Sequence, residues 1–455
     1  MPSYLFNFNV FWDHIDPYGY QEDDVLSLIE QFIFLVHIKN PILDEDVLRR
    51  KAYGVVEDGL GWDGPSCLVL LACALGIVAT PFEGVSKDII LNSEDTSTST
   101  SPPRQRVLEE AEAYFMLARK RIGLLSQSML AIQYHFLTGI FLMYCFKPLE
   151  AFQNFHQASM TFQIYFRSVT ASIRSASDSR AEQRLFWSCF KSECEILSEI
   201  DLPQSGVGIL RHLHTFPSPP DLSSVGSPLT TTDDSTAYRP APAPASASSA
   251  ASQSNRVLSC YYFENHDAWM DLNTPSKIQV ATELLRQLDQ WYECLPHLVR
   301  YHEDGQETQA QIPQEELPYM PRVRCLEIRA LVCRPFLFYM VHSVPAADDH
   351  AHDPDPDQRS VLRLFISQAL YCSRQLIESI SLRHRHHGTW YTLRLSTICA
   401  LSIYAAAKRN LAPDGWETSV RLTINTLQYW ENEAPRDIRK AREILQDLLS
   451  GVSKD

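Results

Sequence analysis

The spacing of large apolar residues is the feature that most constrains how this chain can fold. In one segment, steps of three and four positions join Phe152, Phe155, Ser159, Phe162 and Phe166, four of which are aromatic. This spacing places them in a single stripe along a helix. Residues 278–295 have the same periodicity and are followed by a proline, which predicts where that helix ends. Because no part of the chain shows the sustained alternation of a strand, the sequence predicts an all-α fold.

Residues 128–145 read "SMLAIQYHFLTGIFLMYC" and are apolar on nearly every side of a helix. Such a segment is typical of the centre of a large helical bundle, because a surface helix would carry a polar face. The longest apolar run, from Cys67 to Ala79, is shorter than the roughly 20 residues needed to cross a bilayer. We therefore expect a large, irregular helical bundle without a membrane-spanning segment.

Four segments have the composition of loops. The most pronounced, 217–255, is rich in Pro, Ser and Ala and cannot bury enough apolar surface to offset the entropy lost on ordering. We expect it to be a disordered linker between a first helical half, 1–216, and a second helical half, 256–455. Further loops are expected at 86–106 in the first half and at 301–321 and 343–358 in the second.

The net charge of −15 argues against electrostatic binding of nucleic acid over a large surface, because such binding depends on Lys and Arg side chains that neutralise phosphates. The eleven cysteines have no regular spacing and mostly lie in apolar helical contexts. We interpret them as reduced, buried thiols of an intracellular protein. The first residues lack the basic start and continuous apolar segment of a secretory signal.

Three short segments combine residue types that could carry chemistry. The glycines of Glu57–Ser66 lack the lysine of a phosphate-binding loop, so we expect Asp63 and Pro65 to begin a helix instead. The acidic and histidine-containing segment Asp348–Asp357 has no regular scaffold to fix a coordination geometry and is expected to be a solvated loop. Arg383–Gly388, "RHRHHG", is expected to supply capping or turn residues at a helix end.

Other chemical signatures are weak. The segment "EDDVL" at Glu22 is expected near a helix start, and the chain has no Asp-Asp-x-x-Asp on a helix as terpene cyclases do. It also has no Gly-x-Ser-x-Gly elbow, and His135 lies in an apolar helix, where a core histidine is expected. We predict no catalytic, cofactor-binding or metal-ligating residues in this chain.

The densest cluster of reactive side chains is "RLFWSCFKSECE" at Arg184–Glu195. On a helix, Cys189 and Cys194 diverge by roughly 140° around the axis, so they cannot readily chelate one ion or form a disulfide. A stripe of Phe186, Phe190, Cys194 and Leu197 forms one face, with Leu185, Cys189 and Ile196 beside it. Both thiols are therefore predicted to behave as small core hydrophobes.

Six separated stretches share features with one known family. They are "EQFIFLVHIKNPILD" at 30–44, "GWDGPSCLVLLACALG" at 61–76, "LTGIFLMYCFKPLEAFQNFHQASMTFQIY" at 137–165, "EQRLFWSCFKSECEILSEIDLPQSG" at 182–206, "LLRQLDQWYECLP" at 284–296 and "VCRPFLF" at 332–338. Together they resemble the middle homology region of fungal binuclear zinc cluster transcription factors, also known as the fungal-specific transcription factor domain. The resemblance covers nearly the whole chain outside the linkers.

The resemblance implies a nuclear regulator of RNA polymerase II transcription that controls a metabolic pathway or a secondary-metabolite gene cluster. In that family the middle region is an all-helical regulatory domain that receives signals from protein partners or a small-molecule effector. It implies no catalytic residues. Because the sequence shows no sustained heptad pattern, it makes no prediction of the oligomeric state.

This sequence departs from the family in one respect. Members bind two zinc ions through six cysteines in a basic amino-terminal run, whereas no Cys-x-x-Cys occurs here and the first cysteine is Cys67. Either the chain begins downstream of that DNA-binding module or it regulates without binding DNA itself. Zinc is expected only if such a cluster precedes this chain. The alternative function is an all-α enzyme of secondary metabolism, with the Asp348 segment or a buried Cys and His as its site.

Overall fold

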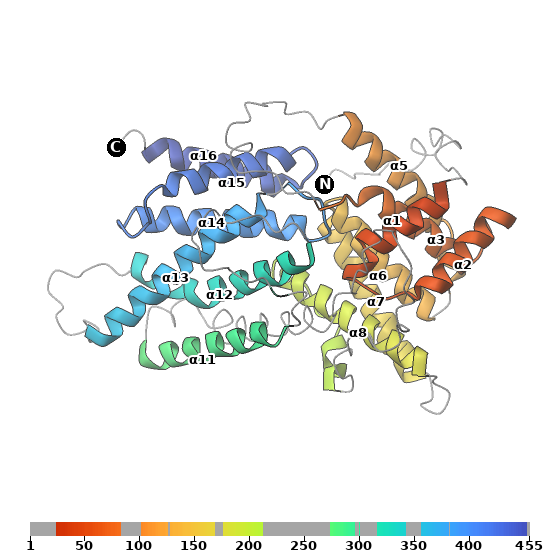
Figure 1. The fold of residues 1–455 in the computed structure, drawn as a ribbon, viewed down its shortest axis with the longest axis horizontal. Helices are drawn as coiled ribbons and strands as arrows, with labels where there is room; N and C mark the ends of the chain where they lie inside the picture. The colour runs from red at the N-terminus through yellow and green to blue at the C-terminus, as the bar shows by residue number, and fades with distance from the viewer. Residues whose placement is uncertain are drawn as a thin grey trace, which may run out of the picture.

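The computed structural model describes residues 24–82, 102–125, 128–168, 176–212, 274–295, 300, 316–342, 356–381 and 383–452. Within these ranges it contains thirteen α-helices, three short 3₁₀ helices and no strand, which confirms the predicted all-α fold. The helices fall into two groups that lie next to one another along the long axis of the molecule (Figure 1).

The first group contains the elements from α1 to η6, drawn from red to yellow-green in Figure 1. Its members are α1 (Val25–Leu35), η3 (His37–Lys39), α2 (Glu45–Asp58), α3 (Gly64–Val78), α5 (Pro102–Arg119), η4 (Ile122–Leu124), α6 (Met129–Tyr144), α7 (Pro148–Ser168), α8 (Ala176–Leu197) and η6 (Val207–His212).

The second group contains the elements from α11 to α16, drawn from green to blue. Its members are α11 (Thr274–Glu293), α12 (Glu316–His342), α13 (Pro356–Ile380), α14 (Thr389–Ala407), α15 (Trp416–Trp430) and α16 (Arg436–Val452).

Two helices without a polar face form the centre of the first group. Almost every residue of α3 and α6 is buried, and α3 packs against α1, α5 and α6 while α6 packs against α7. The Asp63 side chain caps α3 by accepting a hydrogen bond from the backbone N–H of Ser66 at 2.7 Å. With Pro65 in the first turn, this cap confirms the helix start predicted in Glu57–Ser66.

The predicted aromatic stripe of α7 faces this core, where Phe155 and Phe162 are fully buried. Phe162 lies against Phe186 of α8, with ring centroids 5.7 Å apart. The second group is built by sequential packing, in which each helix from α11 to α16 contacts the next one along the chain. None of the described helices is both long and apolar enough to cross a membrane.

Three helices begin inside segments that the sequence predicted to be loops. α5 begins at Pro102 rather than after 106, α12 begins at Glu316 rather than after 321, and α13 begins at Pro356 rather than after 358. The boundaries were wrong because proline-rich composition was interpreted as loop, whereas a proline in the first turn loses no intrahelical hydrogen bond. α12 even contains Pro321 and Pro335 within its length. The predicted linker 217–255 lies outside the described residues.

Close packing between α1 and α3 requires a glycine at position 76. A Cβ added to Gly76 would lie well inside contact distance of the Leu28 carbonyl oxygen and 3.4 Å from the Phe32 nitrogen, so backbone of α1 would have to move. By contrast, a Cβ on Gly54 of α2 would meet nothing within 4 Å. The two helical glycines therefore form a matched pair for substitution.

We predict opposite effects of alanine at these two positions. Gly76→Ala is expected to destabilise the protein by about 1–3 kcal/mol, because overpacking against a backbone cannot be relieved by a side-chain rotation. Gly54→Ala is expected to stabilise it by about 0.5–1 kcal/mol, because a helix interior favours alanine over glycine. Urea unfolding of both variants measures the difference, and equal effects at the two positions would contradict the packing described for α1 and α3.

Candidate functional site

A buried cluster of charged and polar side chains lies where the two groups of helices meet. Its members come from η3 and α6 in the first group, from α12, and from the segments that follow α13 and α15 in the second. We call it the central polar cluster, and it consists of Lys39, Tyr144, Glu316, His384, Arg385, His386, His387 and Glu433.

The centre of this cluster is the Glu316 carboxylate. Its Oε1 lies 2.7 Å from the Lys39 Nζ and 3.2 Å from the His384 Nε2. The Glu316 side chain is 6% exposed and that of Lys39 is 10% exposed, so both charges are withdrawn from water. Because an ionised carboxylate only accepts hydrogen bonds, the His384 Nε2 carries the proton and donates it.

Burial alone would raise the pKa of the Glu316 carboxyl, but the positive charge of Lys39 and the hydrogen bond from His384 hold it well below its usual range. Burial alone would lower the pKa of the Lys39 amine, and the nearby Tyr144 and Glu316 raise it above its usual value. The two groups thus stabilise each other's charged forms. Removing either one would leave a buried charge without its partner.

Arg385 forms the second crossing between the groups. Its guanidinium donates to the Tyr144 carbonyl oxygen at 2.7 Å, at the last residue of α6, and it also pairs with Glu433. The same guanidinium lies 5.1 Å from the ring centroid of Trp430 and 5.4 Å from that of Phe146. Cation–π contacts of this kind add to the ion pair because the site is largely desolvated.

His386 and His387 occupy the loop that leads into α14. The backbone N–H of Gly388 donates to the His386 Nδ1 at 3.0 Å, so this ring nitrogen carries no proton. The backbone N–H of His386 donates to the Thr389 hydroxyl at 2.9 Å. Burial lowers the pKa of His386 to about 3 and that of His387 well below its usual value. His386 thus serves as a turn residue, as expected for Arg383–Gly388, but within a buried segment.

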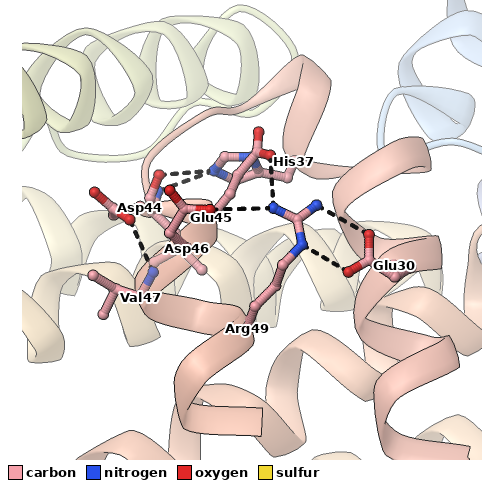
Figure 2. A network of polar contacts seen from close by, with 8 residues as sticks. Glu30, His37, Asp44, Glu45, Asp46, Val47 and Arg49 are labelled. Atoms are coloured by element: carbon pink, nitrogen blue, oxygen red, sulfur yellow. Dashed lines mark hydrogen bonds and ion pairs between the residues drawn. The ribbon is translucent and has the colours of Figure 1, made fainter. Parts of the chain in front are cut away.

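The loop that carries Lys39 is fixed by a second polar network, between α1, η3 and α2 (Figure 2). Arg49 of α2 binds both oxygens of the Glu30 carboxylate on α1, at 2.7 and 3.0 Å, and also reaches Glu45. The His37 ring accepts a hydrogen bond from the Leu43 N–H at 3.1 Å. These contacts position η3, so that its last residue, Lys39, points its amine at Glu316.

The motif "RLFWSCFKSECE" also contributes to this junction, through its charges rather than its thiols. Cys189 is fully buried on α8, as predicted, while Cys194 is only partly buried. Burial raises the pKa of the Cys189 thiol, which therefore stays protonated. Lys191 is buried beside the cluster, and its Nζ donates to the Asn40 side chain at 3.2 Å.

The remaining sequence candidates are dispersed. His135 is half-buried on α6 against the Tyr134 ring, as expected of a histidine at the edge of a core. Glu22 and residues 348–355 lie outside the described residues, although α1 does begin close after Glu22, at Val25. Within the described part of the chain, no group of three or more His, Cys, Asp or Glu side chains is arranged to hold a metal ion.

The central polar cluster has little free volume. A cavity beside it, bounded by Tyr319, His384, His386, Thr389 and Trp430 among others, has a volume of about 10 Å³. That is about the space required by one water molecule. The charges of the cluster are directed at one another across the two groups of helices. The arrangement therefore suits a polar contact between two bodies.

Sequence reasoning did not identify most of this cluster. Glu316 lies in a segment predicted to be a loop, and Tyr144 was counted only as an apolar helix residue. One local signal was present, because "HIKN" places charged and polar residues between the apolar Val36 and Ile42. Polar residues in such a position require buried partners.

Comparison of the chain with family models, with curated proteins and with solved structures finds no match.

The neutral buried imidazoles predict an acid-sensitive fold. An unfolded chain protonates its histidines below about pH 6.5, whereas folded His386 stays neutral until about pH 3, so acid favours the unfolded state across that interval. His386→Asn retains an acceptor for the Gly388 N–H and removes the titration. As the pH falls, we expect the unfolding free energy of this variant to decrease less steeply than that of the wild type. The two slopes should differ by up to about 1.4 kcal/mol per pH unit.

Urea unfolding of His386→Asn and of the wild-type protein at several pH values between about 6.5 and 4 measures this slope. His342→Asn is the control, because His342 lies exposed at the end of α12. Parallel stability curves for wild type and His386→Asn would show that His386 is not held neutral in the folded protein.

Proposed function

We propose that this chain is the helical regulatory domain of a nuclear regulator of RNA polymerase II transcription, controlling a metabolic or secondary-metabolite gene cluster. The observation that carries the proposal is that several of the stretches resembling the fungal family meet at the central polar cluster. Lys39 of stretch 30–44, Tyr144 of stretch 137–165 and Lys191 of stretch 182–206 all lie in or beside the central polar cluster. Three of the six stretches on which the resemblance rests thus meet at one junction.

A charged junction between two groups of helices is physically suited to regulation. Buried ion pairs stabilise a fold less than apolar packing of similar size, but losing one partner is costly, so a partner or effector that competes for one charge changes the energy of the junction. In this proposal the domain has no catalytic residues. Its inputs are proteins of the transcription machinery and a small-molecule effector.

The charge of the chain bears on how it would reach DNA. With 55 acidic and 40 basic residues, the chain lacks the positive charge that holds DNA-binding proteins on phosphates. DNA contact is therefore assigned to a separate module. In this proposal a zinc cluster preceding the chain supplies it, or a DNA-binding partner does.

A tethering experiment tests this proposal. The full 455-residue chain is fused to a heterologous DNA-binding domain and expressed in fungal cells that carry a reporter gene. We expect reporter transcription to differ clearly from that given by the DNA-binding domain alone. We also expect Glu316→Gln in the fusion to change that output, because it leaves Lys39 without its counter-charge. Reporter messenger RNA is measured at equal fusion-protein levels.

Glu57→Gln is the matched control, because Glu57 is exposed on α2. An untethered fluorescent fusion reports localisation, which is expected to be nuclear. Unchanged reporter transcription together with exclusion from the nucleus would contradict the proposed function. A purified chain with stoichiometric bound metal and metal-dependent turnover of a small molecule would favour an all-α enzyme instead.

A further inference from the structure

The two groups of helices contact each other differently from the way they are built internally. Among the described helices, two helices that pack against each other over several residues belong to the same group. The exception is α6, which packs against α14 of the other group. Residues 213–273, which separate η6 from α11 in the sequence, lie outside the described residues. Among the described residues, the two groups are joined by non-covalent contacts. The nature of those contacts therefore decides whether the arrangement is fixed.

Ion pairs cross between the groups along the whole junction. Besides Lys39 with Glu316, the crossing pairs are Arg104 with Glu433, Glu195 with Arg324, and Glu199 with Arg394 at 2.7 Å. Two of them lie at the edge of the junction, where the Arg324 and Arg394 side chains are 30% and 32% exposed. We call these crossing pairs the seam.

Apolar contacts also cross the junction. Phe82 contacts Tyr319 and the His384 ring, each at a centroid distance of 5.2 Å, and Phe146 contacts Trp430 at 5.5 Å. The buried apolar side chains of the two groups form one continuous cluster, whereas extended helix-on-helix packing is almost confined to each group. Contacts between two parts of one chain that include many polar pairs resemble transient contacts between proteins, for which relative motion is the default.

We propose that the two groups of helices are separable bodies, and that the seam ion pairs control an opening of the molecule in which each body stays folded. The buried Lys39–Glu316 pair has the largest effect on the closed population, because losing one partner leaves the other charge buried without its counter-charge in the closed state. The pairs at the edge contribute less, because water already screens them. This inference does not depend on the proposed transcriptional role.

Hydrogen exchange of the full-length protein distinguishes seam opening from global unfolding. The reporting amides are those of Asn40 and Thr389, which bond to the His37 and His386 carbonyls at 3.0 Å. The reference amides are those of the fully buried part of α3, residues 67–75. In the wild-type protein we expect the reporting amides to exchange faster than those of α3. In Glu316→Gln we expect exchange at the reporting amides to rise on the order of 100-fold and to stay faster than that of α3.

A second variant and a salt titration keep the test decisive if Glu316→Gln does not fold. Arg394→Gln removes the edge pair with Glu199, together with a pair to Asp437 inside the second group, and we expect it to raise exchange at the reporting amides about two- to fivefold. Raising the salt from about 0.1 to 1 M shortens the Debye length from about 10 to 3 Å and is expected to act in the same direction. An apolar junction would not be weakened by salt.

Arg286→Gln is the matched control. Its partner Glu283 lies on the same helix, α11, and both side chains are exposed, so the pair does not join the two groups. Equal free energies of opening at the reporting amides and in α3 would overturn the proposal, because the molecule would then open as one unit. Unchanged exchange in both seam variants would overturn it as well.

Discussion

The Lys39–Glu316 ion pair is the interaction on which the arrangement of the two groups of helices depends. It joins η3 of the first group to the first residue of α12 in the second, with the Lys39 Nζ 2.7 Å from the Glu316 Oε1. Both side chains are almost completely buried. Each charge is costly to bury alone, and the pair is stabilised by the further hydrogen bond that His384 provides to Glu316. The surrounding loops are correspondingly fixed, by Arg49 on one side and by the His386 turn on the other.

Within each group a different principle operates. α3 and α6 are buried on nearly all sides, so their contribution is apolar and nearly independent of charge. Small residues allow close approach, as Gly76 does between α3 and α1. The molecule thus combines an apolar core with buried charges at the contact between the two groups, and acid is expected to act mainly on that contact. Regulation of the kind we propose would use this difference, because a ligand can compete for a charge more easily than for a core.

The sequence was sufficient to predict elements whose signal is local. The aromatic stripe of α7, the apolar α6 and the Asp63 cap follow from spacing and capping chemistry within a few residues. Helix starts at Pro102, Glu316 and Pro356 were missed because proline is compatible with a first turn as well as with a loop. The central polar cluster could not be predicted, because Lys39 and Glu316 are distant in sequence and nothing near either one specifies its partner. Only the folded chain brings them together.

A double-mutant cycle on Lys39→Met and Glu316→Gln tests the central claim most directly. If the pair is buried and mutually dependent, each single variant should lose about 3–5 kcal/mol of unfolding free energy, because it strands one buried polar or charged partner. The double variant should lose much less than the sum, which gives a coupling energy on the order of 3 kcal/mol. Additive losses, or single variants as stable as the wild type, would show that this pair does not hold the two groups of helices together.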